Sequence, residues 1–143
     1  MDLNIKNNII ILINNSSSAI LSSIDENNYP EMKSMFIAKH DGLKTFWFST
    51  NVSSKRYQDW NNNFKAGLYI VDTTHIHGLM LLGKMTIHND IETKKAFWND
   101  GDERYYPQGV NDPDYCIMSF NTESGTYWEN GKHIIDKNML QEF

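Results

Sequence analysis

The feature that most constrains this chain is a succession of short extended segments separated by turn residues. Residues 31–40 can place alternate side chains on two faces, Asp41-Gly42 follows, and residues 44–50 continue as KTFWFST. Asp-Gly between two extended segments is a strong hairpin signal, because glycine accepts the positive φ that a tight turn requires. The same alternation of extended segment and turn recurs along the chain, which predicts mainly antiparallel β-structure.

The remaining segments complete a small β fold with peripheral helices. Strands are predicted over residues 17–25, 31–40, 44–50, 65–72, 78–88, 115–121 and 124–129, with a turn over residues 26–30 and a long loop over residues 99–114. Helices are predicted over residues 3–14, 53–62, 90–98 and 136–142, although the β-branched residues of 3–14 also fit a strand. Because six or seven short strands leave many unpaired edges, closure into a small barrel is the expected architecture.

Length and composition narrow the class of protein. A chain of 143 residues can bury a core of its own, so we expect one domain over residues 1–143. The net charge of −5 argues against nucleic-acid binding, which requires a basic face. Cys116 is the only cysteine, which excludes an intramolecular disulfide, and the apolar run IIILI is far too short for a membrane span. We therefore expect a cytoplasmic protein with no membrane partner.

Polar and basic residues gather where a predicted strand leads into a predicted helix. The strand ends in Ser49-Thr50-Asn51, and the first turn of the helix contains Ser53, Ser54, Lys55 and Arg56. Free backbone N–H groups, hydroxyls and cations at a helix start favour an anion, best a phosphate. The alternative is an ordinary helix cap followed by a solvated basic turn. Lys33, on the preceding predicted strand, would face the same anion or else point to solvent from a sheet edge.

With these residues in place, the chain resembles the FMN-binding split-barrel proteins related to pyridoxamine 5'-phosphate oxidase, in particular their general-stress-protein branch. The resemblance spans about residues 5–130 and rests on an ordered set of short motifs: Tyr29-Pro30-x-x-Lys33-x-Met35, Phe46-Trp47-Phe48-Ser49-Thr50, Ser54-Lys55, Trp60-Asn61-Asn62-Asn63, Gly83-Lys84, Phe97-Trp98-Asn99, Tyr106-Pro107-x-Gly109, Asp112-Pro113-x-Tyr115 and Trp128. It implies a six- or seven-stranded antiparallel split β-barrel, mainly β with small helices, and FMN as the cofactor.

The resemblance also implies which residues hold the cofactor phosphate. Lys33, Ser54 and Lys55 would contact it, with Arg56 as an auxiliary. Many relatives carry arginine where this chain has Lys33. Lysine keeps the positive charge but lacks the bidentate fork of a guanidinium, which lowers the expected affinity for FMN.

Further roles follow from the same resemblance. Phe48, Ser49 and Thr50 would lie along the flavin ring and its ribityl chain. The family generally forms homodimers with two flavin sites at the interface, so that Trp128 or the loop over residues 105–115 would reach the flavin of the partner.

The expected function is that of an FMN-dependent oxidoreductase, with NADH, NADPH or a small molecule as the second substrate. No acid–base catalytic residue can be named from the sequence. With two arginines in all, the chain has little to clamp a phosphorylated substrate, so true pyridoxamine phosphate oxidase activity is not expected. Two alternatives stay open: a stress-related module that binds a flavin or another planar ligand without turnover, and an empty barrel that acts as an interaction domain.

Other chemistry-bearing residues fit simpler interpretations. His75 and His77 would share a face of a strand and reach a common metal ion, but no third ligand has suitable spacing, so no metal site is predicted. Cys116 begins an apolar strand and is expected to be buried. Tyr105 and Tyr106 would either cover a substrate or pack onto the barrel mouth.

Overall fold

The computed structural model describes residues 3–135, and the side chains of residues 3–132. Its helices are α1 (Leu3–Asn14), α2 (Lys55–Asn62) and α3 (Ile91–Phe97), with short 3₁₀ turns η1 (Asp102–Arg104) and η2 (Gly109–Asn111). Its strands are β1 (Ser18–Ile24), β2 (Pro30–Phe36), β3 (Lys39–Asp41), β4 (Thr45–Asn51), β5 (Lys65–Asp72), β6 (His77–His88), β7 (Tyr115–Glu129) and β8 (Lys132–Ile135). The predicted helix over residues 136–142 lies outside the described residues.

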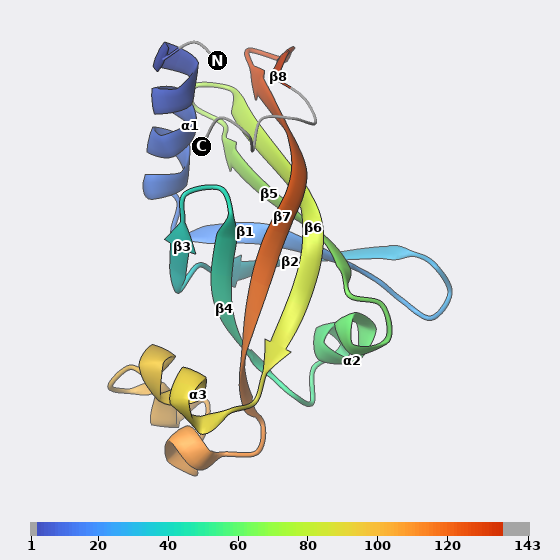
Figure 1. Ribbon diagram of the computed structural model, residues 1–143, viewed down its shortest axis with the longest axis vertical. Helices are drawn as coiled ribbons and strands as arrows, with labels where there is room; N and C mark the ends of the chain where they lie inside the picture. Colours follow the sequence, from blue (N-terminus) through green and yellow to red (C-terminus); the bar gives the residue numbers. More distant parts are fainter. Residues whose placement is uncertain (1–2, 136–143) are drawn as a thin grey trace.

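The strands form one antiparallel sheet that curls into a half-barrel (Figure 1). Seven of them follow each other in the order β2-β1-β5-β6-β7-β4-β3, and the short β8 pairs with β7. The predicted mainly β, antiparallel split-barrel fold is therefore confirmed. Phe46, Phe48 and Phe120, all fully buried, contribute to the core inside the curl, which α1 completes with Ile9 and Ile13.

The strand predicted over residues 31–40 is two strands, and its division closes the barrel. β2 pairs with β1, whereas β3 pairs with β4 at the other end of the strand order. Between them the Ile37 N–H donates to the Ser17 carbonyl and the Ala38 N–H to the Trp47 carbonyl. A single straight strand cannot pair with both edges of a curled sheet, so the chain bends here. The prediction of one strand was wrong for this reason.

The two strands predicted over residues 115–121 and 124–129 are one continuous strand, β7. Its pairing with β6 shifts beside Gly83, where Gly83 faces Thr122 and Leu82 faces Ser124, so that Glu123 is the extra residue of a β-bulge. A Cβ on Gly83 would lie 2.0 Å from the Asn121 carbonyl oxygen, which explains the glycine. The polar residues that indicated a break mark this bulge instead.

Two turns join neighbouring strands as hairpins. The Asp41-Gly42 hairpin is confirmed, although its loop covers residues 42–44 rather than two residues. The hairpin between β7 and β8 was missed. Asn130 and Gly131 form its two-residue turn, both with positive φ (51° and 76°), which is the geometry that favours Asn-Gly. The Asn130-Gly131 dipeptide is typical of a hairpin turn and could have predicted strand β8.

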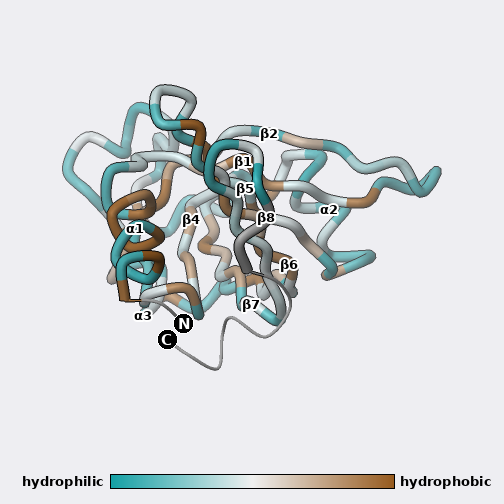
Figure 2. The backbone as a smooth tube through the Cα atoms, turned by 90° about the horizontal axis from the view of Figure 1, so that it is seen from above, coloured by the Kyte–Doolittle hydropathy of each residue, from teal (hydrophilic) through white to brown (hydrophobic). Residues whose placement is uncertain are grey.

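The β1–β2 hairpin extends away from the rest of the sheet in both views (Figures 1 and 2). At its base α2 packs against β1: the Trp60 indole N–H donates to the Ser22 carbonyl, and the Ser23 hydroxyl donates to the buried Asp59 carboxylate at 3.0 Å. These contacts fix where α2 begins relative to β1 and β2. They therefore position the polar start of α2, which the sequence singled out.

Candidate functional site

A cavity of about 670 Å³ lies where β2 approaches β4 at the closure of the half-barrel, and we call it the seam cavity. Residues 33–38 of β2 and the β2–β3 link form one part of its lining, and residues 49–51 at the end of β4 form another. Helix α2 supplies Arg56. The segment from the end of α3 toward β7 supplies Phe97, Asn99, Asp102, Tyr105 and Tyr106. Its volume falls in the range of small-molecule sites. It therefore has room for a cofactor-sized ligand.

Two buried polar atoms beside this cavity lack a hydrogen-bond partner among the described residues: Thr50 Oγ1 and Arg56 Nε. Thr50 is 3% exposed, and both residues line the seam cavity. Burial lowers the pKa of the Arg56 guanidinium, which nevertheless keeps its charge at neutral pH. Since buried polar groups are normally paired, an unpaired hydroxyl and an unpaired guanidinium nitrogen beside one cavity indicate a polar or anionic ligand.

Of the four residues predicted to bind phosphate, two line the seam cavity, three line an adjoining groove and one lines neither. Lys33 and Arg56 line both the seam cavity and a smaller adjoining groove of about 370 Å³, whereas Lys55 lines the groove alone. Ser54 lines neither. It is the N-cap of α2, where its hydroxyl oxygen accepts the Tyr57 N–H. Its hydroxyl proton remains available to a ligand at the helix start.

Lys55 is surrounded by carboxylates. Its Nζ lies within 4 Å of four acidic side chains: Glu31 at 2.7 Å, Glu26 at 3.6 Å, Asp59 at 3.7 Å and Asp25 at 3.9 Å. The hydrogen bond to Glu31, together with the other carboxylates, raises the pKa of the Lys55 ammonium. Lys55 thus links the β1–β2 hairpin to α2, and its charge is already matched. Its predicted role toward phosphate stays a prediction.

The three predicted flavin-contacting residues of β4 differ in their placement. Ser49 is exposed and lines the seam cavity, and Thr50 lines it from the buried face. The Phe48 side chain lies fully inside the barrel core. Strand alternation separates Phe48 from Ser49, so only the backbone of Phe48 is available for the predicted contact with a flavin.

The loop after α3 forms one wall of the seam cavity and packs as an aromatic cluster. Tyr106 and Tyr115 are buried with ring centroids 4.8 Å apart, and Trp98 stacks edge-on against Tyr115 at 5.1 Å. Burial raises the pKa of the Tyr115 phenol to about 12, and its hydroxyl donates to the Lys94 carbonyl at 2.9 Å. Tyr106 therefore packs onto the barrel mouth, whereas Tyr105 is 65% exposed at the cavity rim.

Asp114 ties this loop to the end of β4. Its carboxylate accepts the Asn51 side-chain amide and the Ser53 N–H, both at 2.7 Å, and its carbonyl accepts the Val52 N–H. The hydrogen bond from Asn51, followed by that from Ser53, lowers the pKa of the Asp114 carboxyl. Two walls of the seam cavity are thereby held together.

Trp128 lies away from the seam cavity of its own chain. Its ring is half-buried on β7 against Tyr69, with centroids 6.4 Å apart, and lines another depression with Gly78 and His77. The structure therefore does not place Trp128 with Lys33, Ser49 and Thr50 within one chain. The expected contact of Trp128 with a partner's flavin stays a prediction.

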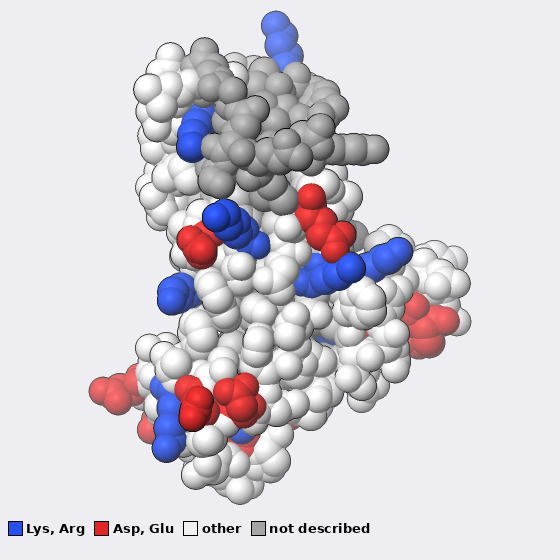
Figure 3. Space-filling view, in the orientation of Figure 1, with Lys and Arg blue, Asp and Glu red and all other residues white. Residues whose placement is uncertain are grey.

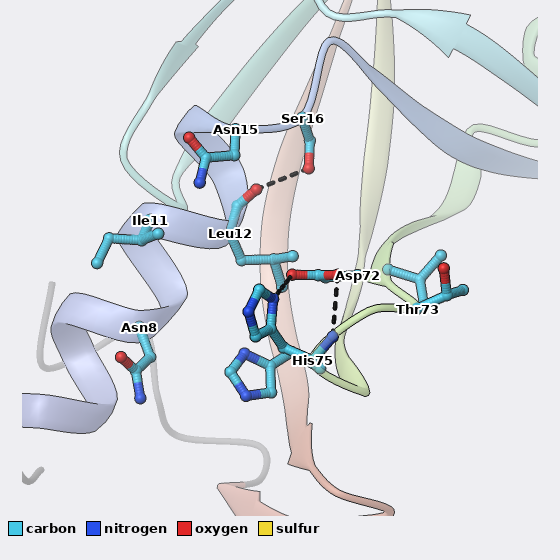
Figure 4. Close-up of a pocket in the computed structure, with 10 residues that line it drawn as sticks. Asn8, Ile11, Leu12, Asn15, Ser16, Asp72, Thr73 and His75 are labelled. Atoms are coloured by element: carbon cyan, nitrogen blue, oxygen red, sulfur yellow. Dashed lines mark hydrogen bonds and ion pairs between the residues drawn. The ribbon is translucent and has the colours of Figure 1, made fainter.

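A second groove, of about 470 Å³ and distinct from the seam cavity, lies between α1 and the β5–β6 turn (Figure 4). His75 Nδ1 lies 2.6 Å from the Asp72 carboxylate, and the ring centroids of His75 and His77 are 6.0 Å apart. Among the residues that the structure describes, no three His, Cys, Asp or Glu side chains are placed to share a metal ion. Likewise, within the described part of the chain, no helix is long and apolar enough to cross a membrane.

Sequence reasoning missed several residues of the seam cavity. Asn99 and Asp102 belong to the predicted long loop over residues 99–114, and Phe97 belongs to a predicted helix; none of these three was predicted as a site residue. The motif Phe97-Trp98-Asn99, already used for the resemblance, was the available signal. It marks the point where the chain leaves α3 and turns over the cavity.

An open antiparallel half-barrel with a cavity at its closure defines the small split β-barrel class of fold. Comparison with protein families adds the particular class: the family described as "Pyridoxamine 5'-phosphate oxidase like" matches residues 5–140. The chain belongs to the pyridoxamine 5'-phosphate oxidase-like family. No curated protein matches the sequence at a significant level.

Solved structures agree with this assignment. A Clostridium acetobutylicum protein related to general stress protein 26 of B. subtilis is 39% identical, with a TM-score of 0.86 over 98% of this chain and 99% of that one. General stress protein 26 from Bacillus anthracis is 21% identical, with a TM-score of 0.73 over 92% and 98%. A heme-binding protein from Mycobacterium smegmatis is 11% identical, with a TM-score of 0.73 over 94% of this chain and 58% of that one. The last two show the shared fold alone.

Proposed function

We propose that this protein binds FMN in the seam cavity and acts as an FMN-dependent oxidoreductase on a small substrate. The observation that carries the proposal is the pair of unpartnered buried atoms, Thr50 Oγ1 and Arg56 Nε, beside a cavity that also contains Lys33. Phosphate oxygens accept hydrogen bonds from guanidinium, ammonium and hydroxyl groups. Membership of the family provides independent support for a flavin.

The residues present fit FMN in three respects. Lys33 and Arg56 offer two positive charges to a phosphate of about −2 charge at pH 7. Ser54 lines neither the seam cavity nor the groove, but it caps the eight-residue helix α2, and the free N–H groups at the start of that helix favour an anion. The cavity is large enough for the flavin as well as its phosphate. Bound FMN would supply hydride and electron transfer, and the protein would position the ring and limit access of water.

We also propose a homodimer. The outward-facing residues of five adjacent strands form a surface that we call the uncharged face: Met32, Ser34 and Phe36 of β2; Ser18, Ile20 and Ser22 of β1; Gly67, Tyr69 and Val71 of β5; Gly78, Met80 and Leu82 of β6; and Ser124, Thr126 and Trp128 of β7. It includes no charged residue. Phe36 is 80% exposed and Leu82 45% exposed, as expected for a surface that a partner covers.

The uncharged face would also bring Trp128 to a partner's cavity. Ser34 and Phe36 belong both to this face and to the lining of the seam cavity, so the cavity opens at the β2 edge. Trp128 lies at the opposite, β7 edge. In a two-fold symmetric dimer built on this face with its axis parallel to the strands, the β7 edge of each subunit would approach the β2 edge of the other. This geometry supports the role predicted for Trp128.

The second candidate function is binding of a planar ligand without turnover. The Mycobacterium smegmatis relative, a heme-binding protein, makes haem the second ligand to test. The experiment is a visible absorption spectrum of the purified protein before and after incubation with FMN, or with hemin, and desalting. Retention of about one flavin per chain, reduced by NADH or NADPH, supports the oxidoreductase. Flavin that is retained but not reduced supports the binding module, and a protein that retains only hemin refutes FMN as its cofactor.

A further inference from the structure

Within the described part of the chain, the lining of the seam cavity includes one acidic side chain besides its two cations. Asp102 belongs to η1, and its neighbours Asn99 and Tyr105 also line the cavity. Lys33 and Arg56 come from β2 and α2 instead. In Figure 1 the segment after α3 and helix α2 lie on different sides of the lower sheet, so Asp102 and Arg56 belong to elements on different sides of it.

Among the residues that the structure describes, no cation other than Lys33 and Arg56 lines the seam cavity. Arg104, the only other arginine, donates from Nε to the Gly101 carbonyl at 3.1 Å and packs 5.4 Å from the Tyr105 ring. Lys94 is buried, with Nζ 3.3 Å from the Asp112 carbonyl. Once the FMN phosphate pairs with Lys33 and Arg56, the Asp102 carboxylate is the formal charge that remains in the lining.

We propose that the second ligand of the cavity, the substrate beside the flavin, is uncharged or cationic, and that Asp102 selects it over anionic molecules. A protonated amine is the chemical class that a single carboxylate in a polar rim recognises best. The proposal rests on FMN binding and adds the substrate class. It excludes a phosphorylated substrate. The substrate phosphate would lie beside the like-charged Asp102 carboxylate, and no unpaired cation would remain in the lining to bind it.

The surroundings of Asp102 agree with this role. Its Oδ2 accepts the Asn99 N–H at 2.9 Å, which fixes the carboxylate at the rim. Burial raises the pKa of the nearby Tyr106 phenol, and the carboxylates of Asp114 and Asp102 raise it further. Figure 3 shows several Asp and Glu side chains, with Lys or Arg side chains among them, at this end of the molecule. A cation approaching the rim meets the Asp102 carboxylate, and Tyr106 stays neutral.

Asp102→Asn isolates the charge, since an asparagine oxygen can still accept the Asn99 N–H. Asp100→Asn is the matched control: it makes the same change of net charge in the same loop, at an exposed residue that does not line the cavity. The FMN-loaded proteins are titrated with pyridoxamine and with pyridoxamine 5'-phosphate, and binding is followed through the flavin absorbance. Reoxidation of the dithionite-reduced proteins is timed with hexaammineruthenium(III), a cation, and with ferricyanide, an anion.

We expect the native protein to bind pyridoxamine more tightly than its phosphate. Asp102→Asn should lower this preference, and the ratio of the rate with the cationic oxidant to that with ferricyanide, by roughly three- to tenfold, and Asp100→Asn by less than about twofold. A native preference for pyridoxamine 5'-phosphate, or equal effects of the two variants, overturns the proposal while FMN binding stands. Failure to retain FMN overturns the proposed function, and this inference with it.

Discussion

Arg56 and Thr50 line one cavity from a helix and from a strand, and Arg56 Nε and Thr50 Oγ1 are both buried without a hydrogen-bond partner among the described residues. Folding has brought them together from segments that belong to different elements, α2 and β4. An unpaired buried donor normally destabilises a protein by about 1–3 kcal/mol. The phosphate of the proposed FMN would supply the partner that this pair lacks.

Arg56 should carry most of the preference for phosphate. We expect Arg56→Gln to lower the ratio of riboflavin to FMN dissociation constants by roughly 10- to 100-fold, since hydrogen bonds to charged groups contribute about 1.5–3 kcal/mol. Riboflavin lacks the phosphate, so the ratio isolates the phosphate contact. Fluorescence titration of both flavins measures it. Arg104→Gln, which removes an arginine outside the cavity lining, should leave the ratio unchanged.

Lys33 and Lys55 should differ in the same assay. We expect Lys33→Gln to lower the ratio, because Lys33 lines the seam cavity, and Lys55→Gln to change it less, because four carboxylates already surround the Lys55 ammonium. Instead, Lys55→Gln should loosen the β1–β2 hairpin, which limited proteolysis detects. A larger loss for Lys55→Gln than for Lys33→Gln would restore Lys55 as the main phosphate ligand.

Thr50→Val should separate stability from binding. It removes an unpaired buried hydroxyl while keeping the side-chain volume, so we expect the free protein to unfold at the same or a slightly higher temperature and FMN to bind more weakly. Calorimetry with and without FMN measures both effects. Ser23→Ala is the comparison, since it removes a hydrogen bond to the buried Asp59 and should lower the unfolding temperature. A Thr50→Val protein with lowered stability and native FMN affinity contradicts a ligand role.

Gly83→Ala should be strongly destabilising. Its Cβ would meet the Asn121 carbonyl oxygen at 2.0 Å, a backbone contact that only a shift of β7 can relieve, and we expect a loss of more than about 2 kcal/mol in denaturant unfolding. Gly67→Ala is the milder control, because its Cβ would meet the Ser22 hydroxyl, which can rotate away. Equal losses in both variants would mean that the bulge is not the constraint.

Acid should weaken the contact between the α3–β7 loop and β4. The hydrogen bonds from Asn51 and Ser53 lower the pKa of Asp114 in the folded protein. The ionised Asp114 carboxylate therefore stabilises the folded protein. Its contribution is complete above the pKa of about 3.9 that an aspartate has in the unfolded chain, and it is lost as the pH falls through the lower pKa of Asp114 in the folded protein. We expect Asp114→Asn to flatten the fall of unfolding temperature below about pH 4. Asp100→Asn, an exposed change of the same charge, serves as control.

The uncharged face gives a test of the homodimer. We expect Leu82→Glu to yield a monomer in size-exclusion chromatography and light scattering, because it places a charge within the proposed interface. Thr86→Glu, on the same strand but outside this face, should leave the dimer intact. A native monomer, or a Leu82→Glu dimer, removes the support for Trp128 at a partner's site.

The sequence by itself determined most of the local structure. Periodicity and caps located α1, β5 and the start of α2, and the motifs around Lys33, Ser49 and Arg56 identified the family and part of the cavity. These signals are local, because hydrophobic period, turn residues and capping side chains act within a few residues. The Asn130-Gly131 turn belongs to the same class and was simply not used.

Tertiary structure decided what depends on contacts between distant segments. Residues 31–40 bend because the curled sheet offers them partners at opposite edges, and β7 continues through its bulge because Gly83 lets the Asn121 carbonyl approach. The charge of Lys55 is matched by residues of the β1–β2 hairpin as well as by Asp59. Curvature and electrostatic neighbours arise only when the chain closes on itself, so a linear pattern cannot specify them.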